Sequence, residues 1–273
     1  MDNKISLAGD LGSGKSTVSA ILTERLGAKY YSTGAIVRKI AESRNMTVVE
    51  LNKYMETHPE IDHEIDAGIA ALSEAPESLI IDSRMAWHFT KGTFKVYLST
   101  DIETSAYRIM SANRQGEQAA SFEETIANTR ARRDSEKKRY LEQYGVNIKD
   151  LTNYTLIVDT TVATPTEVAD CIERGFRLWQ ADKSYSEACI SPERLNFPDI
   201  EPDTELVARL SCMLDRGEAI PTPEVVEADG EFYLVSGLES AMAYSFSMST
   251  YIYARLISGS VPEGEFVKMK NSL

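Results

Sequence analysis

The stretch that decides the fold is Gly9-Asp10-Leu11-Gly12-Ser13-Gly14-Lys15-Ser16, which matches the pattern GxxxxGK[ST] at every position. A short apolar run, Ile5 to Ala8, precedes it. After it, apolar residues recur at helical spacing, at Val18, Ile21, Leu22 and Leu26. A strand, this loop and then a helix form the context that a phosphate-binding loop requires. The sequence therefore predicts that this loop binds the phosphates of a nucleotide.

The residue types of the loop explain how it would bind phosphate. Glycines allow backbone angles that a Cβ would forbid, so the N–H groups of the loop can converge on phosphate oxygens at the start of a helix. Lys15 is predicted to act on the β and γ phosphates as a catalytic group, and the Ser16 hydroxyl is predicted to ligate Mg²⁺. The predicted cofactors are ATP and Mg²⁺, bound by Gly9, Gly12, Ser13, Gly14, Lys15, Ser16 and Thr17. A structural glycine-rich turn and a loop that binds nucleotide without turnover are the alternatives.

Strand and helix patterns alternate through the first two thirds of the chain. The further strand-like runs are Ala28 to Tyr31, Leu79 to Ile81, Phe94 to Leu98 and Thr155 to Val158. Helical patterns fill the gaps between them, and a closing helix is available from Thr166 to Trp179. This alternation predicts an α/β fold, with a parallel sheet and helices on both of its faces.

Polar residues at the ends of two predicted strands indicate where a second substrate would bind. Thr33 and Arg38 follow the second strand, and Asp82 and Arg84 end the third. Ligands of open α/β sheets bind outside the carboxyl ends of the strands. Two arginines at this edge could bind a dianionic phosphate through forked hydrogen bonds. Taken alone, Arg38 fits a solvated helix face better than a phosphate site.

A dense basic segment lies between the fourth and fifth predicted strands. It contains Arg130, Arg132, Arg133, Lys137, Lys138 and Arg139. A charge run of this kind is usually a solvated helix face. Its position in a phosphate-loop fold instead predicts a mobile lid, whose arginines neutralise the transferring phosphoryl group and whose closure excludes water.

Residues 1 to about 175 resemble cytidylate kinase, in the branch of the archaeal type. The resemblance is carried by ISLAGDLGSGKSTV, YYSTGAIVRKIA, YMETHPEIDHEID, LIIDSRMAW and RRDSEKKRYLEQYGVNIKDLTNYTLIVDTT. It implies a five-stranded parallel sheet with a lid, and transfer of the ATP γ-phosphate to CMP or dCMP. It also implies that Thr33 and Arg38 bind the monophosphate and that Arg84 lies at the acceptor site.

The same resemblance assigns roles within the basic segment. Arg132 and Arg139 match the lid pattern R-x-x-S-E-x-x-R-Y, which implies that they are catalytic. Arg130 and Asp134 match lid positions of the bacterial branch instead, which would put Arg130 on the nucleotide. The departures from the family pattern are Ser83 in place of glycine, and Asn147 and Thr155 in place of carboxylates. These departures fit either a structural change or a shifted substrate.

The pattern changes between Ala181 and Asn196, where prolines appear. We expect two domains, residues 1–182 and residues 183–273. The second, a small α+β domain, is predicted to contain helices at Asp203 to Arg216 and Leu238 to Phe246, a hairpin turning at Asp229-Gly230, and a strand at Tyr251 to Ile257.

The C-terminal domain weakly resembles the ParB-like nucleotide-binding fold. The cues include Ser191-Pro192-Glu193-Arg194-Leu195 and Phe232-Tyr233-Leu234-Val235-Ser236-Gly237. That family carries an arginine-rich turn where this chain has Gly237-Leu238-Glu239-Ser240, which contains no arginine. We therefore expect an accessory module for homodimer formation or partner binding, rather than a second nucleotide site.

Composition limits the partners and the compartment. A formal net charge of −13 argues against general binding to nucleic acid or to an anionic membrane, so the expected partners are small nucleotides. The 3 cysteines have no CxxC spacing, which predicts neither a disulfide framework nor a zinc site. Because no window of about 18 residues is continuously apolar, we expect a cytoplasmic protein. Two rival functions remain: a kinase of another small acceptor, and a nucleotide-sensing adaptor.

Overall fold

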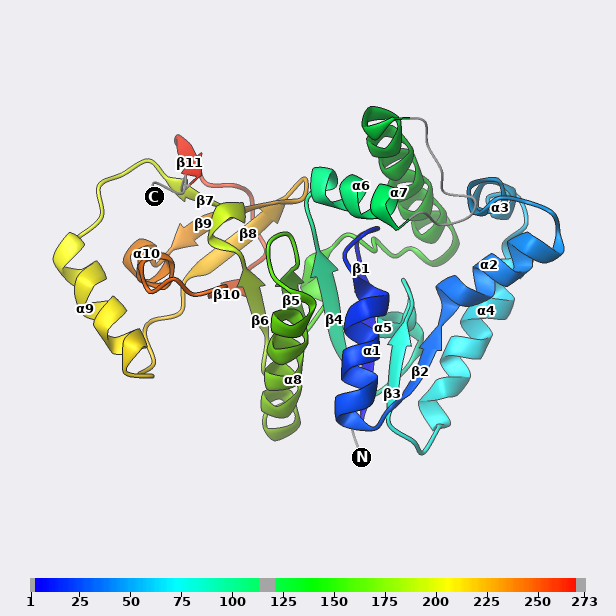
Figure 1. Cartoon of the computed structure of the whole chain (residues 1–273), viewed down its shortest axis with the longest axis horizontal. Coiled ribbons are helices and arrows are strands. Elements are labelled where there is room, and N and C mark those ends of the chain that lie inside the picture. Colours follow the sequence, from blue (N-terminus) through cyan, green and yellow to red (C-terminus); the bar gives the residue numbers. More distant parts are fainter. Residues whose placement is uncertain (1–2, 113–120, 269–273) are drawn as a thin grey trace. The chain divides into compact units, whose positions relative to one another are not determined.

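The computed structural model of the chain, shown in Figure 1, describes residues 3–112 and 121–268. The chain divides into two compact units, Met1–Asn153 and Tyr154–Leu273. The predicted domain boundary, between residues 182 and 183, lies further along the chain than this division. The accessory role of the C-terminal part stays a prediction.

The first unit is built on four parallel strands. In spatial order they are β4, β1, β3 and β2. Their bounds are β1 Lys4–Gly9, β2 Lys29–Ser32, β3 Leu79–Asp82 and β4 Thr93–Ser99. Strand β1 is buried along its whole length because it lies between two neighbours and under helices. The α/β fold class predicted from the alternating pattern is therefore confirmed.

Helices cover both faces of these strands. Their bounds are α1 Lys15–Leu26, α2 Thr33–Ser43, α3 Val48–Met55, α4 Pro59–Ala71, α5 Ala86–Phe89, α6 Ile102–Ser111 and α7 Phe122–Tyr144, with short 3₁₀ turns at Leu72–Glu74 and Leu151–Asn153. Helix α1 contacts β1, β2 and β3 in front of the sheet in Figure 1, and α5 lies behind it. Ile81 packs in one apolar cluster with Leu51, Met55 and Ile65 from α3 and α4. Leu79 belongs to the same cluster as Ile81, because residues two apart on a strand point to the same face.

The basic segment forms part of one continuous helix, α7. Ser121 accepts a hydrogen bond from the Glu124 N–H at its start, and Gly145 ends it with a left-handed φ of 65°. Met85, Tyr140 and Ile148 form an apolar cluster that fixes the C-terminal half of α7. The segment predicted as a lid is therefore anchored at its far end by burial of apolar surface.

The phosphate loop is packed closely against the end of β4. A Cβ at Gly9 would collide with the backbone of Leu98, and Gly9 has a φ of 149°. The Asp10 N–H donates to the Leu98 carbonyl at 2.9 Å. The Asp10 carboxylate accepts hydrogen bonds from the Tyr97 hydroxyl at 3.0 Å and the Thr100 N–H at 3.1 Å. These contacts hold the start of the loop against β4, and at residue 9 only glycine allows so close an approach.

Lys149 completes this anchorage from the segment after α7. Its ammonium donates to Asp10 Oδ1 and to the Tyr97 hydroxyl, the latter at 2.8 Å. Arg133 Nη2 lies 3.7 Å from the same carboxylate. Burial alone would raise the pKa of Asp10, but the charges of Lys149 and Arg133 outweigh it and lower the pKa to about 2.

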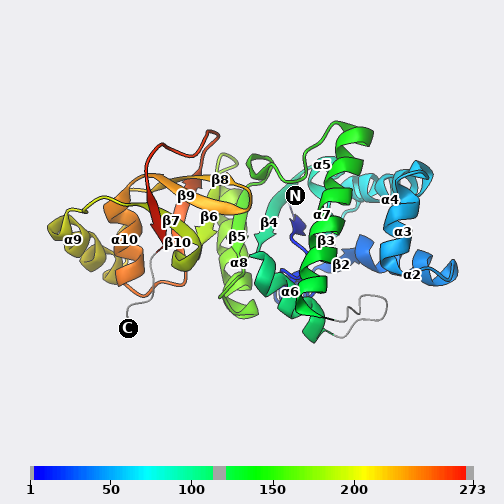
Figure 2. The ribbon, with the colours of Figure 1, turned by 90° about the horizontal axis from the view of Figure 1, so that it is seen from above.

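Within the described residues, the second unit contains seven strands in the order β11, β7, β9, β8, β10, β6 and β5. Their bounds are β5 Leu156–Asp159, β6 Glu187–Ile190, β7 Leu195–Pro198, β8 Glu224–Ala228, β9 Glu231–Ser236, β10 Ile252–Leu256 and β11 Phe266–Lys268. The helices are α8 Pro165–Ala181, α9 Thr204–Asp215 and α10 Leu238–Phe246, with a 3₁₀ turn at Pro192–Arg194. Helices α9 and α10 pack side by side (Figure 2).

The two helices, the hairpin and the strand predicted for residues 183–273 are present. Asp229 and Gly230 both have positive φ, 53° and 86°, and join β8 to β9 as an antiparallel hairpin. Strand β5 forms as predicted and falls within this unit, where it pairs in parallel with β6 and α8 packs on it. Cys171 and Cys189 are buried free thiols and Cys212 is an exposed one. No helix within residues 3–112 and 121–268 is long and apolar enough to cross a membrane.

Replacement of Lys149 by methionine tests the anchorage of the loop. We expect Lys149→Met to lower the free energy of unfolding by about 2 kcal/mol, because Asp10 keeps its burial and loses its main countercharge. In the wild-type protein the low pKa of Asp10 stabilises the fold above about pH 4, and this contribution is lost as the pH falls toward about 2. In the variant the pKa of Asp10 rises, so the loss begins at higher pH.

The measurement is urea unfolding at several values of pH. The matched control is Lys138→Met, because Lys138 makes an exposed pair with Glu142 at 4.0 Å and should contribute less than about 1 kcal/mol. Equal stability of the Lys149 and Lys138 variants at neutral pH would contradict the anchoring role.

Candidate functional site

The ammonium group of Lys15 is hydrogen-bonded to acceptors within the phosphate loop itself. Lys15 Nζ donates to the Asp10 carbonyl at 2.7 Å, to the Gly9 carbonyl at 3.0 Å and to Ser13 Oγ at 3.3 Å. Burial, and after it the charge of Arg84, lowers the pKa of Lys15 to about 7. The carbonyl groups around Lys15 are neutral dipoles. A bound phosphate would give the ammonium group a full negative charge as its partner.

Helix α1 begins at the loop without a side-chain cap. Gly14 stands at the N-cap in the left-handed conformation, with a φ of 81° and no side-chain hydrogen bond. The first N–H groups of α1 therefore remain available to an anion, and the positive end of the helix dipole points the same way. Ser16 and Thr17 are exposed in the first turn. This is the arrangement that the loop sequence predicts.

The residues predicted to bind the second substrate lie at the ends of β2 and β3. The Thr33 hydroxyl donates to the Asp82 carbonyl at 3.3 Å, and the Tyr30 hydroxyl donates to Asp82 Oδ2 at 2.9 Å. Ser83, which replaces the family's glycine, accepts a hydrogen bond from the Met85 N–H at 3.2 Å through its hydroxyl. This contact supports the turn from which Arg84 projects. The departure at residue 83 thus has a local structural role.

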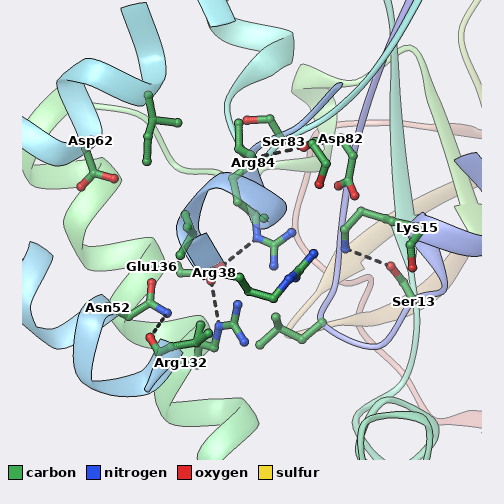
Figure 3. A pocket seen from close by; sticks show the side chains of 18 of the residues that line it. Ser13, Lys15, Arg38, Asn52, Asp62, Asp82, Ser83, Arg84, Arg132 and Glu136 are labelled. Atoms are coloured by element: carbon green, nitrogen blue, oxygen red, sulfur yellow. Dashed lines mark hydrogen bonds and ion pairs between the residues drawn. The ribbon is translucent and has the colours of Figure 1, made fainter. Parts of the chain in front are cut away.

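The carboxylate of the lid pattern R-x-x-S-E-x-x-R-Y, to which the sequence analysis gave no role, lies between two of the predicted arginines (Figure 3). Arg84 Nε donates to Glu136 Oε2 at 2.8 Å, and Arg132 Nε donates to Glu136 Oε1 at 3.2 Å. Burial alone would raise the pKa of Glu136, but the charges of Arg84 and Arg132 lower it to about 2. Glu136 is therefore ionised at neutral pH.

The far end of the site contains two carboxylates from α4. Asp62 Oδ2 pairs with Arg139 Nε at 3.0 Å, and the Arg139 Nη1 group also donates to the Asn52 carbonyl at 3.1 Å. The Tyr144 hydroxyl donates to Asp66 Oδ2 at 2.6 Å, while burial raises the pKa of Asp66 to about 6. Both aspartates lie within the family-like stretch YMETHPEIDHEID. Their spacing of one helical turn was the available signal.

One cavity joins most of the predicted residues. It is lined by Gly12, Ser13, Gly14, Lys15, Ser16, Thr33, Arg38, Asp82, Arg84, Arg132 and Arg139. Gly9 and Thr17 belong to the loop but not to the lining, and Arg130 lies exposed on α7. Six residues to which the sequence analysis gave no role also line it, namely Tyr30, Asn52, Asp62, Asp66, Glu136 and Tyr140.

The electrostatics of the cavity suit an anionic ligand. Five cationic side chains face it, against the four carboxylates of Asp62, Asp66, Asp82 and Glu136. This local balance contrasts with the net charge of −13 for the whole chain. Among the described residues, no group of three or more His, Cys, Asp and Glu side chains could hold a metal ion by themselves. The arrangement is suited to positioning phosphates rather than to acid–base chemistry.

The sequence of the first unit matches a known family. Residues 4–162 match the cytidylate kinase-like family, which is more than half of the chain. The curated cytidylate kinase of Thermoplasma volcanium is 36% identical over 170 residues, which cover 61% of this chain and 87% of that protein. The cytidylate kinase of Halobacterium salinarum is 31% identical over 195 residues, which cover 71% of this chain and 99% of that protein.

A third relative has a different name and is longer. An S-adenosylmethionine-dependent nucleotide dehydratase of Lacinutrix mariniflava is 35% identical over 209 residues, which cover 70% of this chain but only 42% of that protein. The two archaeal relatives, which match this chain over most of their own length, are both named cytidylate kinases. The chain belongs to the cytidylate kinase-like family, in its archaeal-type branch, and is a nucleoside monophosphate kinase.

Proposed function

We propose that this enzyme transfers the γ-phosphate of ATP to CMP or dCMP. The observation that carries the proposal is the single cavity that joins the phosphate loop, the arginines Arg38, Arg84 and Arg132, and the carboxylates of α4. The names of the archaeal relatives support the same acceptor. The acceptor oxygen of a monophosphate is already anionic at neutral pH, so the reaction needs positioning and charge neutralisation rather than a strong general base.

At the ATP end, this chain's residues bind and orient the phosphates. The N–H groups of the loop and of the first turn of α1 would bind the β and γ phosphates, and Lys15 would leave its backbone carbonyls to meet them. Phosphate charge beside Lys15 raises its pKa and keeps it protonated. Mg²⁺, bound with the Ser16 hydroxyl and phosphate oxygens, would neutralise charge that develops during transfer.

At the acceptor end, Arg38, Arg84 and Thr33 would bind the monophosphate and Arg132 would face the group in transfer. Arg84 uses Nε for Glu136, so its two terminal nitrogens remain for a phosphate in forked geometry. The α7 segment would close on the phosphates and exclude water, which prevents hydrolysis of ATP.

The carboxylates of α4 support cytosine as the base. Cytosine presents an amino group, a hydrogen-bond donor, where uracil presents a carbonyl acceptor. A carboxylate of Asp66 or Asp62 would accept from that amino group and would repel the uracil carbonyl. The buried guanidinium of Arg139, ion-paired with Asp62, supplies donors for the acceptor atoms of the base. This set of groups favours CMP over UMP.

An acceptor panel tests the proposal. We expect CMP and dCMP to exceed UMP, AMP and GMP in kcat/KM, measured by release of ADP. Lys15→Ala should lower transfer by about 100-fold or more, because the loop loses its mobile cation. Lys53→Ala, at an exposed position on α3, is the control and should match the wild type. A flat profile across the monophosphates refutes CMP as the acceptor. Absence of turnover with every acceptor would favour the nucleotide-sensing adaptor.

The pKa of Asp66 predicts a pH dependence for base recognition. A carboxyl group with a pKa of about 6 is ionised at pH 8 and is protonated as the pH falls below about 6. We expect the ratio of kcat/KM for CMP between wild type and Asp66→Asn to be about tenfold at pH 8, and to approach one near pH 5.

The variant is needed because the phosphate of CMP also gains a proton near pH 6. That effect is common to both proteins and cancels in the ratio. A ratio that stays constant from pH 5 to about pH 8 would show that Asp66 does not act as an ionised acceptor.

The Lacinutrix mariniflava relative favours one destination for the product. In that protein a region similar to this chain belongs to a longer S-adenosylmethionine-dependent nucleotide dehydratase. We infer that the nucleotide phosphorylated by this chain leads to the substrate of such a dehydration. The relative should then dehydrate cytidine nucleotides when it is assayed with cytidine, uridine, adenosine and guanosine phosphates. Exclusive use of purine nucleotides would break the link without affecting the kinase proposal.

A further inference from the structure

One buried carboxylate joins two arginines that come from different parts of the fold. Arg84 follows β3, whereas Arg132 lies one turn before Glu136 on α7. Each oxygen of Glu136 accepts from a different guanidinium, Oε2 from Arg84 at 2.8 Å and Oε1 from Arg132 at 3.2 Å. Figure 3 shows both contacts and the neighbouring Arg38.

The carboxylate compensates a strong local repulsion. Two guanidinium groups that approach one anion within hydrogen-bond distance lie close to each other, in a cavity that holds Lys15 as well. The side chain of Glu136 is 8% exposed, against 20% for Arg84 and 23% for Arg132. Removal of this one negative charge would leave the two cations facing each other with little water to screen them.

Arg84 contacts Glu136 through Nε, so the edge of its guanidinium with the terminal nitrogens faces the cavity. A guanidinium is planar and rigid, so a bond at Nε fixes the direction of its terminal nitrogens. We propose that Glu136 is a positioning residue of phosphoryl transfer, which holds Arg84 and Arg132 convergent so that one phosphate group meets both. The inference rests on the proposed kinase function and adds a residue that acts through the arginines rather than on the substrate.

Helix α7 has other contacts that hold it in place besides those of Glu136. The C-terminal half of α7 is fixed by the apolar cluster of Met85, Tyr140 and Ile148, and its ends are capped by Ser121 and Gly145. Arg139, one turn beyond Glu136, has its own partner in Asp62. Loss of the Glu136 charge should therefore disturb the arginines more than it disturbs the helix.

The test compares three variants by steady-state kinetics with CMP and ATP. Glu136→Gln keeps the shape and removes the charge, and should lower kcat/KM for CMP by about 100-fold through misplaced arginines. The KM for ATP should change by less than about threefold, because the loop is not altered. Glu136→Asp keeps the charge on a shorter side chain and should recover part of the loss. Glu142→Gln, which removes an exposed charge from the same helix, should match the wild type.

Three outcomes overturn the inference. Wild-type kinetics in Glu136→Gln would show that the arginines need no such support. A lower KM for CMP in that variant would show that the carboxylate competes with the acceptor phosphate. A loss confined to CMP and absent with dCMP would show a direct contact with the ribose. If Glu136→Gln does not fold by circular dichroism, Glu136→Asp carries the comparison, and its kinetics must then fall below those of the wild type.

Failure of the kinase proposal is distinguishable from failure of this inference. If the wild-type protein does not phosphorylate CMP, the proposed acceptor is wrong, and the same variants are compared with the acceptor that the panel identifies. If the wild-type protein uses CMP and Glu136→Gln is unaffected, only the role of Glu136 is wrong.

Discussion

Repulsion between like charges is the constraint on which the site depends. A phosphate-transfer site has to gather cations before any phosphate is present, and guanidinium and ammonium groups that share a partly dry cavity repel one another. The structure resolves this with internal carboxylates. Glu136 lies between Arg84 and Arg132, Asp62 pairs with Arg139, and Asp10 pairs with Arg133 and Lys149. The cations are thereby held in place in the absence of ligand.

This pairing also reconciles an acidic chain with an anionic substrate. The net charge of −13 belongs to the whole chain, whereas the charge that a ligand meets is set by the few side chains that face the cavity. A carboxylate that binds Nε of an arginine leaves the terminal nitrogens of that arginine for phosphate. An arginine that is paired in this way can therefore still bind the substrate. Burial alone would raise the pKa values of Asp10 and Glu136, and the neighbouring cations instead lower each of them to about 2.

Several features could be predicted because they depend on neighbours in sequence. The loop from Gly9 to Ser16 and the helix that follows it are such a case, since glycine conformations and helix starts are local properties. The turn at Asp229 and Gly230 is another. Other features were missed because their partners lie far along the chain. Glu136 interrupts a basic run in the sequence, and only the return of α7 to the end of β3 makes it the partner of Arg84. Nothing in the sequence around Lys149 indicates its role, because its partner Asp10 lies more than a hundred residues earlier.

The same distinction explains the departures from the family pattern and the placement of β5. Asn147 Oδ1 accepts from the Lys149 N–H at 3.1 Å, and so shapes the turn that carries the lysine. Strand β5 was predicted from its own residues, but only the structure shows that it falls in the second unit, paired with β6. The sequence by itself determined the fold class, the phosphate loop and the family, because these rest on local backbone preferences and on periodic burial. The tertiary structure alone decided which carboxylate stabilises which cation, because Coulomb energy depends on distance in space and not on separation along the chain.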